Sequence, residues 1–369
     1  MKIYYSKAII HSVILTIIAC ILAFLFSCCG CSLESDVTDG LGGFEGRKTG
    51  DSIKILNWNL QTFFDGKTNG NEYSDFKGSD SSWDSDHYKK RLQQLCSFIV
   101  IHDADVYVFE EIENIGILQD IFNNLPALNC GKNPWIYACF GNDDLSSLGC
   151  AVLSRYPLSG FKLHQLDYRV SYCFSALSSI SDADEYYDGI AIDPPSMRPL
   201  LEVHIDEGCG LQLFVCHWKS KSGDDDGDTV IWRELQERLL TDRINCLGDS
   251  SVLYLVCGDF NQKLSEFDDQ GAILKSTSVC DSKIVLHGIE SSLTVYSPWN
   301  RTSVQGSYYY NDEWEKIDHF FYNPLLKVAS FSPLISGDHI ENGIPMRYDI
   351  WADKGWSDHL PIECWVSLK

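Results

Sequence analysis

The sequence is short of basic residues. Its 369 residues include 29 lysines and arginines against 52 aspartates and glutamates, which gives a net charge of −23 and a pI of about 4.7. Such acidity keeps a protein soluble, but it excludes a general electrostatic attraction to a phosphate backbone. If the substrate carries phosphates, a metal ion or a few local lysines and arginines have to offset the negative charge.

Two further absences narrow the class of protein. After Phe26 no apolar run is long enough to cross a bilayer, so a protein with several membrane spans is excluded. Beyond residue 50 there is no CxxC pair and no cysteine–histidine spacing typical of zinc. Cys150, Cys216 and Cys257 stand in apolar runs, where a thiol serves as a small hydrophobic group, and the disulfide connectivity stays open.

The N-terminus carries the pattern of an export signal. Lys2 and Lys7 precede an apolar run over residues 8–26, and the letters LFSC lead to Cys28. A cysteine that follows leucine, one spacer and a small residue resembles a bacterial lipobox. We therefore expect residues 1–27 to be a lipoprotein signal peptide and Cys28 to be lipidated. An uncleaved signal anchor is the alternative.

The segment after Cys28 reads as a tether. Residues 28–51 are rich in Gly, Ser and Asp and lack apolar periodicity. With either kind of anchor, we expect residues 52–369 to lie outside the cytoplasm, in the periplasm or at the cell surface, held to the membrane by the N-terminus.

Strand-like runs dominate residues 52–369. Apolar runs of strand length occur at 53–59, 105–111, 150–155, 199–205, 211–217, 251–259, 316–322 and 360–368, and helical spacing at 87–101 and 229–247. Several neighbouring runs leave no room for a helix between them. The pattern predicts one catalytic domain of mixed sheets flanked by helices, not a Rossmann-type parallel sheet.

Polar side chains stand at the ends of these runs. Loops converge at strand ends in layered α/β proteins, and ligands bind there. The set comprises Asn59, Glu111, His217, Asp259, Asn261, Asp318, Asp358 and His359. Each alone has an ordinary explanation as a turn, a cap or a buried hydrogen bond. Together they are rich in oxygen ligands, which suit Mg²⁺, Mn²⁺ or Ca²⁺, and they include two imidazoles that can move protons. The set therefore predicts metal-assisted hydrolysis of a phosphoester.

The order of these motifs resembles the endonuclease/exonuclease/phosphatase superfamily. The matching stretches are LNWN with Asn59, VFEEIE with Glu111, GCAVLSRYP, HWKSK with His217, GDFN with Asp259 and Asn261, IDH with Asp318, and SDHLP with Asp358 and His359. The resemblance covers roughly residues 52–368. It implies a four-layer α/β sandwich, in which two mixed β-sheets pack face to face with helices outside.

The resemblance also implies a role for each residue. Glu111 would be the principal metal ligand, with Asn59 and Asp358 nearby. Asp259 and Asn261 would bind the phosphate or a second metal and orient the nucleophile. His359, polarised by Asp318, would handle the proton of the attacking water. His217 would hydrogen-bond the scissile phosphate or assist the leaving group.

Three positions bear on phosphate binding. Arg198 matches an arginine that the family places before a strand to contact phosphate, although a solvated loop charge is the alternative. Lys219 would add local positive charge beside His217, with the same alternative. Leu148 stands where deoxyribonuclease-type members carry a glutamate paired to the histidine at the His217 position. This departure puts the general-acid role of His217 in doubt, and a metal-bound water is the alternative.

The branch of the family decides the substrate. The string HWKSKSG, followed by a helix with Arg233 and Gln236, resembles bacterial secreted nucleases. We expect a divalent-metal-dependent nuclease, an endonuclease in mode, that cleaves DNA or RNA and has no protein partner. The alternatives are a phosphatase or phospholipase C-type hydrolase of lipid or inositol phosphates, and a surface lipoprotein that binds without catalysis. The aromatic residues Tyr308, Tyr309, Tyr310 and Trp314 are able to stack on bases, although pairing within a strand explains them more simply.

Overall fold

Alternation of apolar residues builds two sheets that share one core. The computed structural model describes residues 52–125, 134–143, 146–165, 197–221, 227–274 and 280–368. These residues belong to a compact unit that spans 48–369. The expected signal peptide, Cys28 and the whole expected tether lie outside the described residues. None of the described helices is both long and apolar enough to span a membrane.

The first sheet is mixed. Its six strands lie in the order β15 (Lys327–Pro333), β18 (Ile362–Ser367), β1 (Ile53–Phe63), β2 (Val106–Ile112), β4 (Gly149–Ser154) and β3 (Tyr137–Gly141). β1 and β2 run parallel, and every other neighbouring pair is antiparallel.

The second sheet repeats this plan. Its eight strands lie in the order β5 (Leu158–His164), β6 (Leu200–Ile205), β7 (Leu211–His217), β8 (Tyr254–Asp259), β14 (Asp318–Tyr322), β11 (Ser292–Ser297), β10 (Cys280–His287) and β9 (Asp268–Leu274). Here β7 and β8 form the parallel pair. Two hairpins stand apart from the sheets, β12 (Tyr308–Tyr310) with β13 (Glu313–Glu315) and β16 (Ile340–Glu341) with β17 (Ile344–Pro345). Short 3₁₀ turns occur at Ser74–Phe76, Leu264–Glu266 and Pro298–Arg301.

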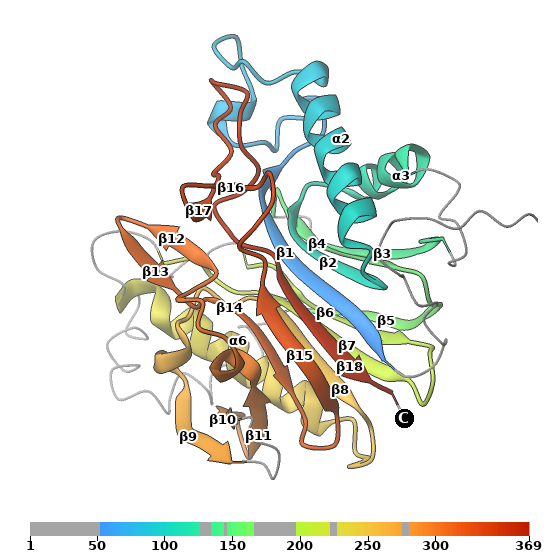
Figure 1. Cartoon of the computed structure of the whole chain (residues 1–369), viewed down its shortest axis with the longest axis vertical. Coiled ribbons are helices and arrows are strands. Elements are labelled where there is room, and N and C mark those ends of the chain that lie inside the picture. The colour runs from blue at the N-terminus through green and yellow to red at the C-terminus, as the bar shows by residue number, and fades with distance from the viewer. Residues whose placement is uncertain are drawn as a thin grey trace, which may run out of the picture. The chain divides into compact units, whose positions relative to one another are not determined.

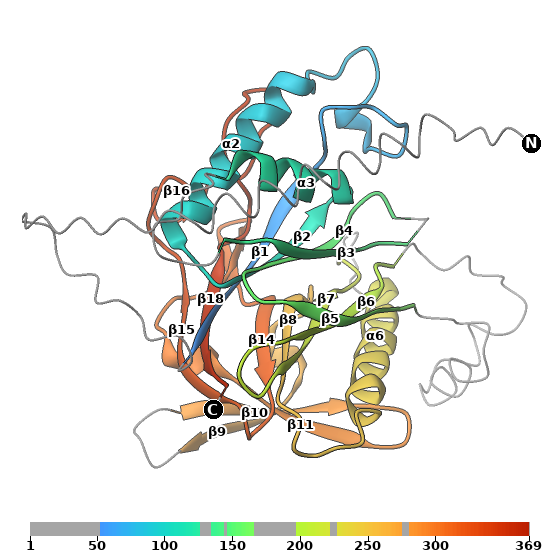
Figure 2. The same ribbon diagram turned by 90° about the vertical axis from the view of Figure 1, so that its right-hand side faces the viewer.

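Helices cover the outer faces of the sheets. α2 (Ser85–His102) and α3 (Ile115–Asn124) lie against the first sheet, and α6 (Gly227–Asn245) lies against the second (Figures 1 and 2). Along β1 the alternation is clear: Ile53 and Ile55 enter the core between the sheets, whereas Leu56 and Trp58 pack under the helices. The expected four-layer α/β sandwich is confirmed.

The expected strands and helices are present, and others join them. Each of the apolar runs forms a strand, and both helical patterns form helices. The edge strand β5 escaped notice because most of its side chains are exposed, which removes the apolar alternation. Helix α3, only 10 residues long, is capped by Asn114, whose side-chain oxygen accepts a hydrogen bond from the Gly116 N–H. The cysteines Cys150, Cys216 and Cys257 are buried free thiols.

Gly258 permits the closest approach between β7 and β8. It has a φ of +140°, and a Cβ atom there would lie 1.8 Å from the Cys216 carbonyl oxygen on the paired strand. Only glycine fits such a contact. The glycine of the GDFN motif therefore sets the strand spacing directly before Asp259.

Substitution of Gly258 tests this constraint. Gly258→Ala should reduce the free energy of unfolding by roughly 3–5 kcal/mol, because backbone strain and overpacking act together. Gly70→Ala is the matched control, since Gly70 also has a positive φ (+99°) but no atom within 4 Å of the added carbon. It should lose about 1–2 kcal/mol. Urea denaturation measures both, and equal losses would contradict the steric argument.

Candidate active site

Strand ends from both sheets meet at one edge of the sandwich. Because β1 and β2 are parallel, and β7 and β8 are parallel, all four strands deliver their carboxyl ends there (Figure 1). His217 and Asp259 are register partners at the ends of β7 and β8. The antiparallel β14 starts at this edge with Asp318 opposite Asp259, and Asp358 and His359 come shortly before β18.

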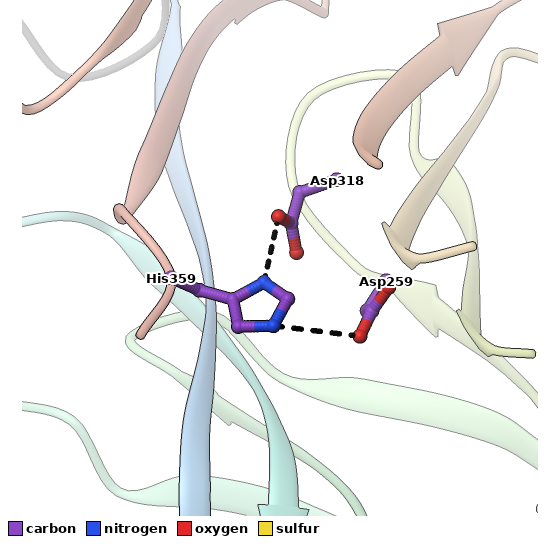
Figure 3. Close-up of side chains that lie close together, drawn as sticks. All are labelled: Asp259, Asp318 and His359. Atoms are coloured by element: carbon purple, nitrogen blue, oxygen red, sulfur yellow. Dashed lines mark hydrogen bonds and ion pairs between the residues drawn. The ribbon is translucent and has the colours of Figure 1, made fainter. Parts of the chain in front are cut away.

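His359 lies between two buried carboxylates (Figure 3). Its Nδ1 is 2.9 Å from Asp318 Oδ2, and its Nε2 is 3.9 Å from Asp259 Oδ2. All three side chains are almost inaccessible to solvent. Burial lowers the pKa of His359, but the carboxylates of Asp318, Asp259 and Asp358 outweigh burial and raise it well above its usual value. Burial also raises the pKa of Asp259.

These three residues also form the tightest group of potential metal ligands among the described residues. Asp318 Oδ2, however, already interacts with the His359 ring. We therefore assign Asp318 and His359 to proton handling and look for the cation site at the neighbouring carboxylates.

Asn59 joins the two sheets at the site. Its Nδ2 donates to Asp259 Oδ2 at 3.0 Å and lies 3.5 Å from Glu111 Oε1. Its Oδ1 accepts the Gln61 N–H at 2.9 Å. In this arrangement Asn59 orients two carboxylates, and the expected role as a metal ligand would require the amide to turn over.

Glu111 and Asp358 supply the more open carboxylates. Glu111 Oε2 accepts the Thr62 N–H at 2.6 Å, and the side chains of Glu111 and Asp358 are 18% and 17% exposed. Burial raises the pKa of Asp358, and the charge of Glu111 raises it further. Two oxygen ligands that repel each other at the mouth of a site fit a hard divalent cation.

Asn261 holds the end of β8 against β7. Its N–H donates to Asp259 Oδ1 at 2.8 Å, and its Nδ2 donates to the Trp218 carbonyl at 3.2 Å. Its φ of +48° turns the chain immediately after Asp259. Asn261 therefore fixes the carboxylate and leaves its amide oxygen for a ligand.

His217 points its Nε2 into the site and leaves its Nδ1 without a partner. The Nε2 is 3.7 Å from Asp259 Oδ2 and 3.9 Å from Glu111 Oε1. Within the described residues the buried Nδ1 makes no hydrogen bond, and Leu148 is a buried apolar residue. Arg198 lines a small cavity beside His217, together with Trp218 and Gln236. Burial, reinforced by Arg198, lowers the pKa of His217, so this imidazole is neutral.

Sequence reasoning missed the buried acid Glu110. Strand alternation turns Glu110 into the space between the sheets, where Asn57 Nδ2 donates to Oε2 at 3.3 Å and Oε1 has no hydrogen-bond partner among the described residues. Burial, followed by repulsion from Asp318 and Asp259, raises the pKa of Glu110 well above its usual value. The only signal was the pair of adjacent acids in VFEE.

Sequence reasoning also missed Arg91, a buried arginine on α2. Its guanidinium donates to the carbonyls of Leu60, Gln61 and Thr62 at 2.7–3.0 Å, and to that of Trp356 at 3.2 Å. The first three carbonyls follow Asn59, and the fourth precedes Asp358. Arg91 therefore clamps two of the loops that carry the site, although it reads in sequence as an ordinary helix-surface cation.

Comparison with known families agrees with this geometry. The model of the "Endonuclease/Exonuclease/phosphatase family" matches residues 56–359. The chain belongs to this family. Members of the endonuclease/exonuclease/phosphatase family are phosphoric ester hydrolases and generally depend on divalent metals. The search of curated proteins by sequence found no match.

Solved structures of the endonuclease/exonuclease/phosphatase family share the fold. A humanised TDP2 from D. rerio has a TM-score of 0.50 at 14% identity, over 85% of this chain and 98% of that one. TDP2 from C. elegans has a TM-score of 0.50 at 11% identity, over 86% and 75%. A mannosyl-6-phosphatase from Bacteroides thetaiotaomicron has a TM-score of 0.48 at 16% identity, over 85% and 99%. At these identities the likeness to the two TDP2 structures concerns the fold alone.

Replacing each of the adjacent acids Glu110 and Glu111 by glutamine should have different effects on activity. Glu110→Gln removes a buried acid without changing its shape, so the fold and most of the activity should remain, with stability equal or higher by about 1 kcal/mol. Glu111→Gln removes a charge that faces the ligand and should lower kcat at least about 100-fold. Urea unfolding measures the change in stability, and the rate of phosphoric ester hydrolysis measures the change in activity. Loss of activity in both variants would contradict the separation.

Proposed function

We propose that the chain is a divalent-metal-dependent phosphodiesterase that cleaves nucleic acid outside the cytoplasm. The observation that carries the hydrolytic part is the arrangement of His359 between Asp318 and Asp259, beside the carboxylates of Glu111 and Asp358. The export signal and Cys28 in the sequence support the location, with a lipid anchor that holds the enzyme at a membrane.

The Asp259 carboxylate accepts the proton of the attacking water, and the charged ring of His359 beside it holds the carboxylate and the water in place. The gap of 3.9 Å between Nε2 and Oδ2 is too long for a direct hydrogen bond, and both groups point to the same space. Asp318 holds the opposite ring nitrogen of His359 and stabilises its charged form. A divalent cation at Glu111 and Asp358 would neutralise the negative charge of the phosphate oxygens.

His217 donates a hydrogen bond to the phosphate and does not act as the general acid. With the proton on Nε2, the neutral ring presents an N–H to the site. The Nδ1 lone pair accepts no hydrogen bond from the described residues. Since Leu148 stands where the glutamate was expected, none of the described carboxylates bonds to Nδ1 to stabilise a charged His217. The leaving group therefore takes its proton from solvent or from a bound water.

Cations on both flanks of the site favour a diester substrate. Arg198 and Lys219 act on His217 at one flank. Arg347, 65% exposed at its side chain, lies 3.9 Å from Asp358 at the other. A phosphodiester continues in two directions from the scissile phosphate, so its neighbouring phosphates meet both flanks. These local charges offset the acidity of the chain where a nucleic acid would lie.

A substrate panel tests the proposal. The full chain in mild detergent, supplied with Mg²⁺ or Mn²⁺, should cleave plasmid DNA or RNA, and EDTA should abolish the activity. Sphingomyelin, inositol phosphates and sugar phosphates serve as the competing substrates. Hydrolysis of one of these with both nucleic acids left intact would replace the nuclease by a phosphatase or phospholipase C-type enzyme.

Removal of the imidazole tests the mechanism. His359→Ala should lower kcat by about 100- to 10,000-fold, the usual range for disrupting general acid–base catalysis, because Asp259 loses the charged ring that holds it and the water in place. His287→Ala is the matched control, because that ring is 53% exposed and lies away from the site on β10. Initial rates at saturating nucleic acid measure both variants. Wild-type activity in His359→Ala would overturn the assigned role.

A further inference from the structure

The β12–β13 hairpin carries a column of aromatic rings that ends at the catalytic pair. The ring centroid of Tyr308 is 4.7 Å from that of His359, and Tyr310 stacks on Tyr308 at 6.2 Å with an interplanar angle of 19°. Tyr310 is 53% exposed. Strand alternation sends Tyr309 to the other face, where it packs on Trp314. The column thus runs from the buried imidazole of His359 to an open ring at the surface.

The base of the hairpin is fixed to the catalytic residues. Ser307 is fully buried, its Oγ accepts the Asp318 N–H at 3.1 Å, and its carbonyl accepts the Leu360 N–H at 2.6 Å. Tyr308 and His359 form an antiparallel bridge. β12 also packs beside β17, which belongs to the β16–β17 hairpin (Figure 1). The rings are therefore held in a set position relative to His359.

An exposed cation accompanies the column. The guanidinium of Arg347 bears on Tyr308 electrostatically, lies beside Asp358 and is largely open to solvent. An aromatic face next to a guanidinium matches a base and its phosphate. Stacking on a base does not depend on the net charge of the protein, so it is available to a chain with a net charge of −23.

We propose that Tyr308 and Tyr310 form a stacking platform for an unpaired base, and that the platform makes this enzyme prefer single-stranded nucleic acid to duplex. The inference rests on the proposed nuclease function. Neighbouring bases cover both faces of a base inside a duplex, so only an unpaired or terminal base offers a face to Tyr310. Because Tyr308 contacts His359 and Tyr310 lies one ring beyond it, that base belongs to a nucleotide that flanks the scissile phosphate.

The test compares two single strands that share a backbone. One is an oligonucleotide of the nucleic acid that the full chain cleaves, and the other is its abasic analogue. The wild type should favour the strand with bases. Tyr310→Ala should reduce the ratio of the two kcat/KM values about 5- to 150-fold, which corresponds to ~1–3 kcal/mol per stacked base at 1.4 kcal/mol per factor of ten. Tyr310→Trp should retain the ratio.

Tyr309→Ala is the matched control, because it removes a neighbouring tyrosine from the opposite face of the same strand. It should keep the wild-type ratio, and thermal melting shows that each variant is folded. Equal cleavage of both strands by the wild type, equal cleavage of duplex and single strand, or an equal loss in Tyr309→Ala overturns the platform and leaves the nuclease standing. Hydrolysis of a sugar phosphate or phospholipid with both strands intact overturns the nuclease and the platform together.

Discussion

The site depends on the hydrogen bond from Asn59 Nδ2 to Asp259 Oδ2, which joins the two sheets at the strand ends. Each sheet contains one parallel strand pair, and the two pairs end at the same edge. Asn59 comes from the pair in the first sheet and Asp259 from the pair in the second. Because this bond fixes the separation of the two ends, it also sets where Glu111 lies relative to His217 and where Asp259 lies relative to His359. Residues that are hundreds of positions apart thereby share one small volume.

Electrostatic balance is the second constraint on this edge. Glu110, Asp259 and Asp318 are buried together, and His359 is the group that compensates them. The more open carboxylates of Glu111 and Asp358 are compensated only in part, by the Thr62 N–H at Glu111 and by His359 and the exposed Arg347 at 3.9 Å from Asp358. A divalent cation is the partner that completes such a set, because it brings two positive charges to oxygen ligands. The net negative charge of the chain would repel a nucleic acid, but at this edge the same carboxylates attract a divalent cation.

The sequence indicated the strands and their polar ends for a clear physical reason. Apolar runs have to be buried, and a polar group that follows such a run has to lie where the burial ends. The position at the end of an apolar run and the resemblance of VFEEIE both assign Glu111 to the site. The structure reaches this outcome differently: a positive φ of +62° at Glu111 and a register shift in β2 turn its side chain out of strict alternation. Neither the bulge nor the orientation of the Asn59 amide leaves a trace in residue order. The contacts of Arg91 are equally invisible there, since they depend on tertiary packing.

Backbone strain concentrates at the same edge. Gln61, Thr62, Glu111 and Asn261 all have positive φ, and for the β-branched Thr62 this conformation is costly. Such residues persist only where surrounding contacts determine them, and Arg91 supplies those contacts for Gln61 and Thr62 through their carbonyl groups. The strained turn in return presents the Thr62 N–H to Glu111. Packing energy from α2, which buries Arg91 against the rings of Phe63 and Tyr348, is thus used to hold a carboxylate at the place where a cation and a phosphate would meet. The helix layer over the first sheet therefore supports the chemistry without contacting the substrate, and the site depends on this layer as well as on both sheets.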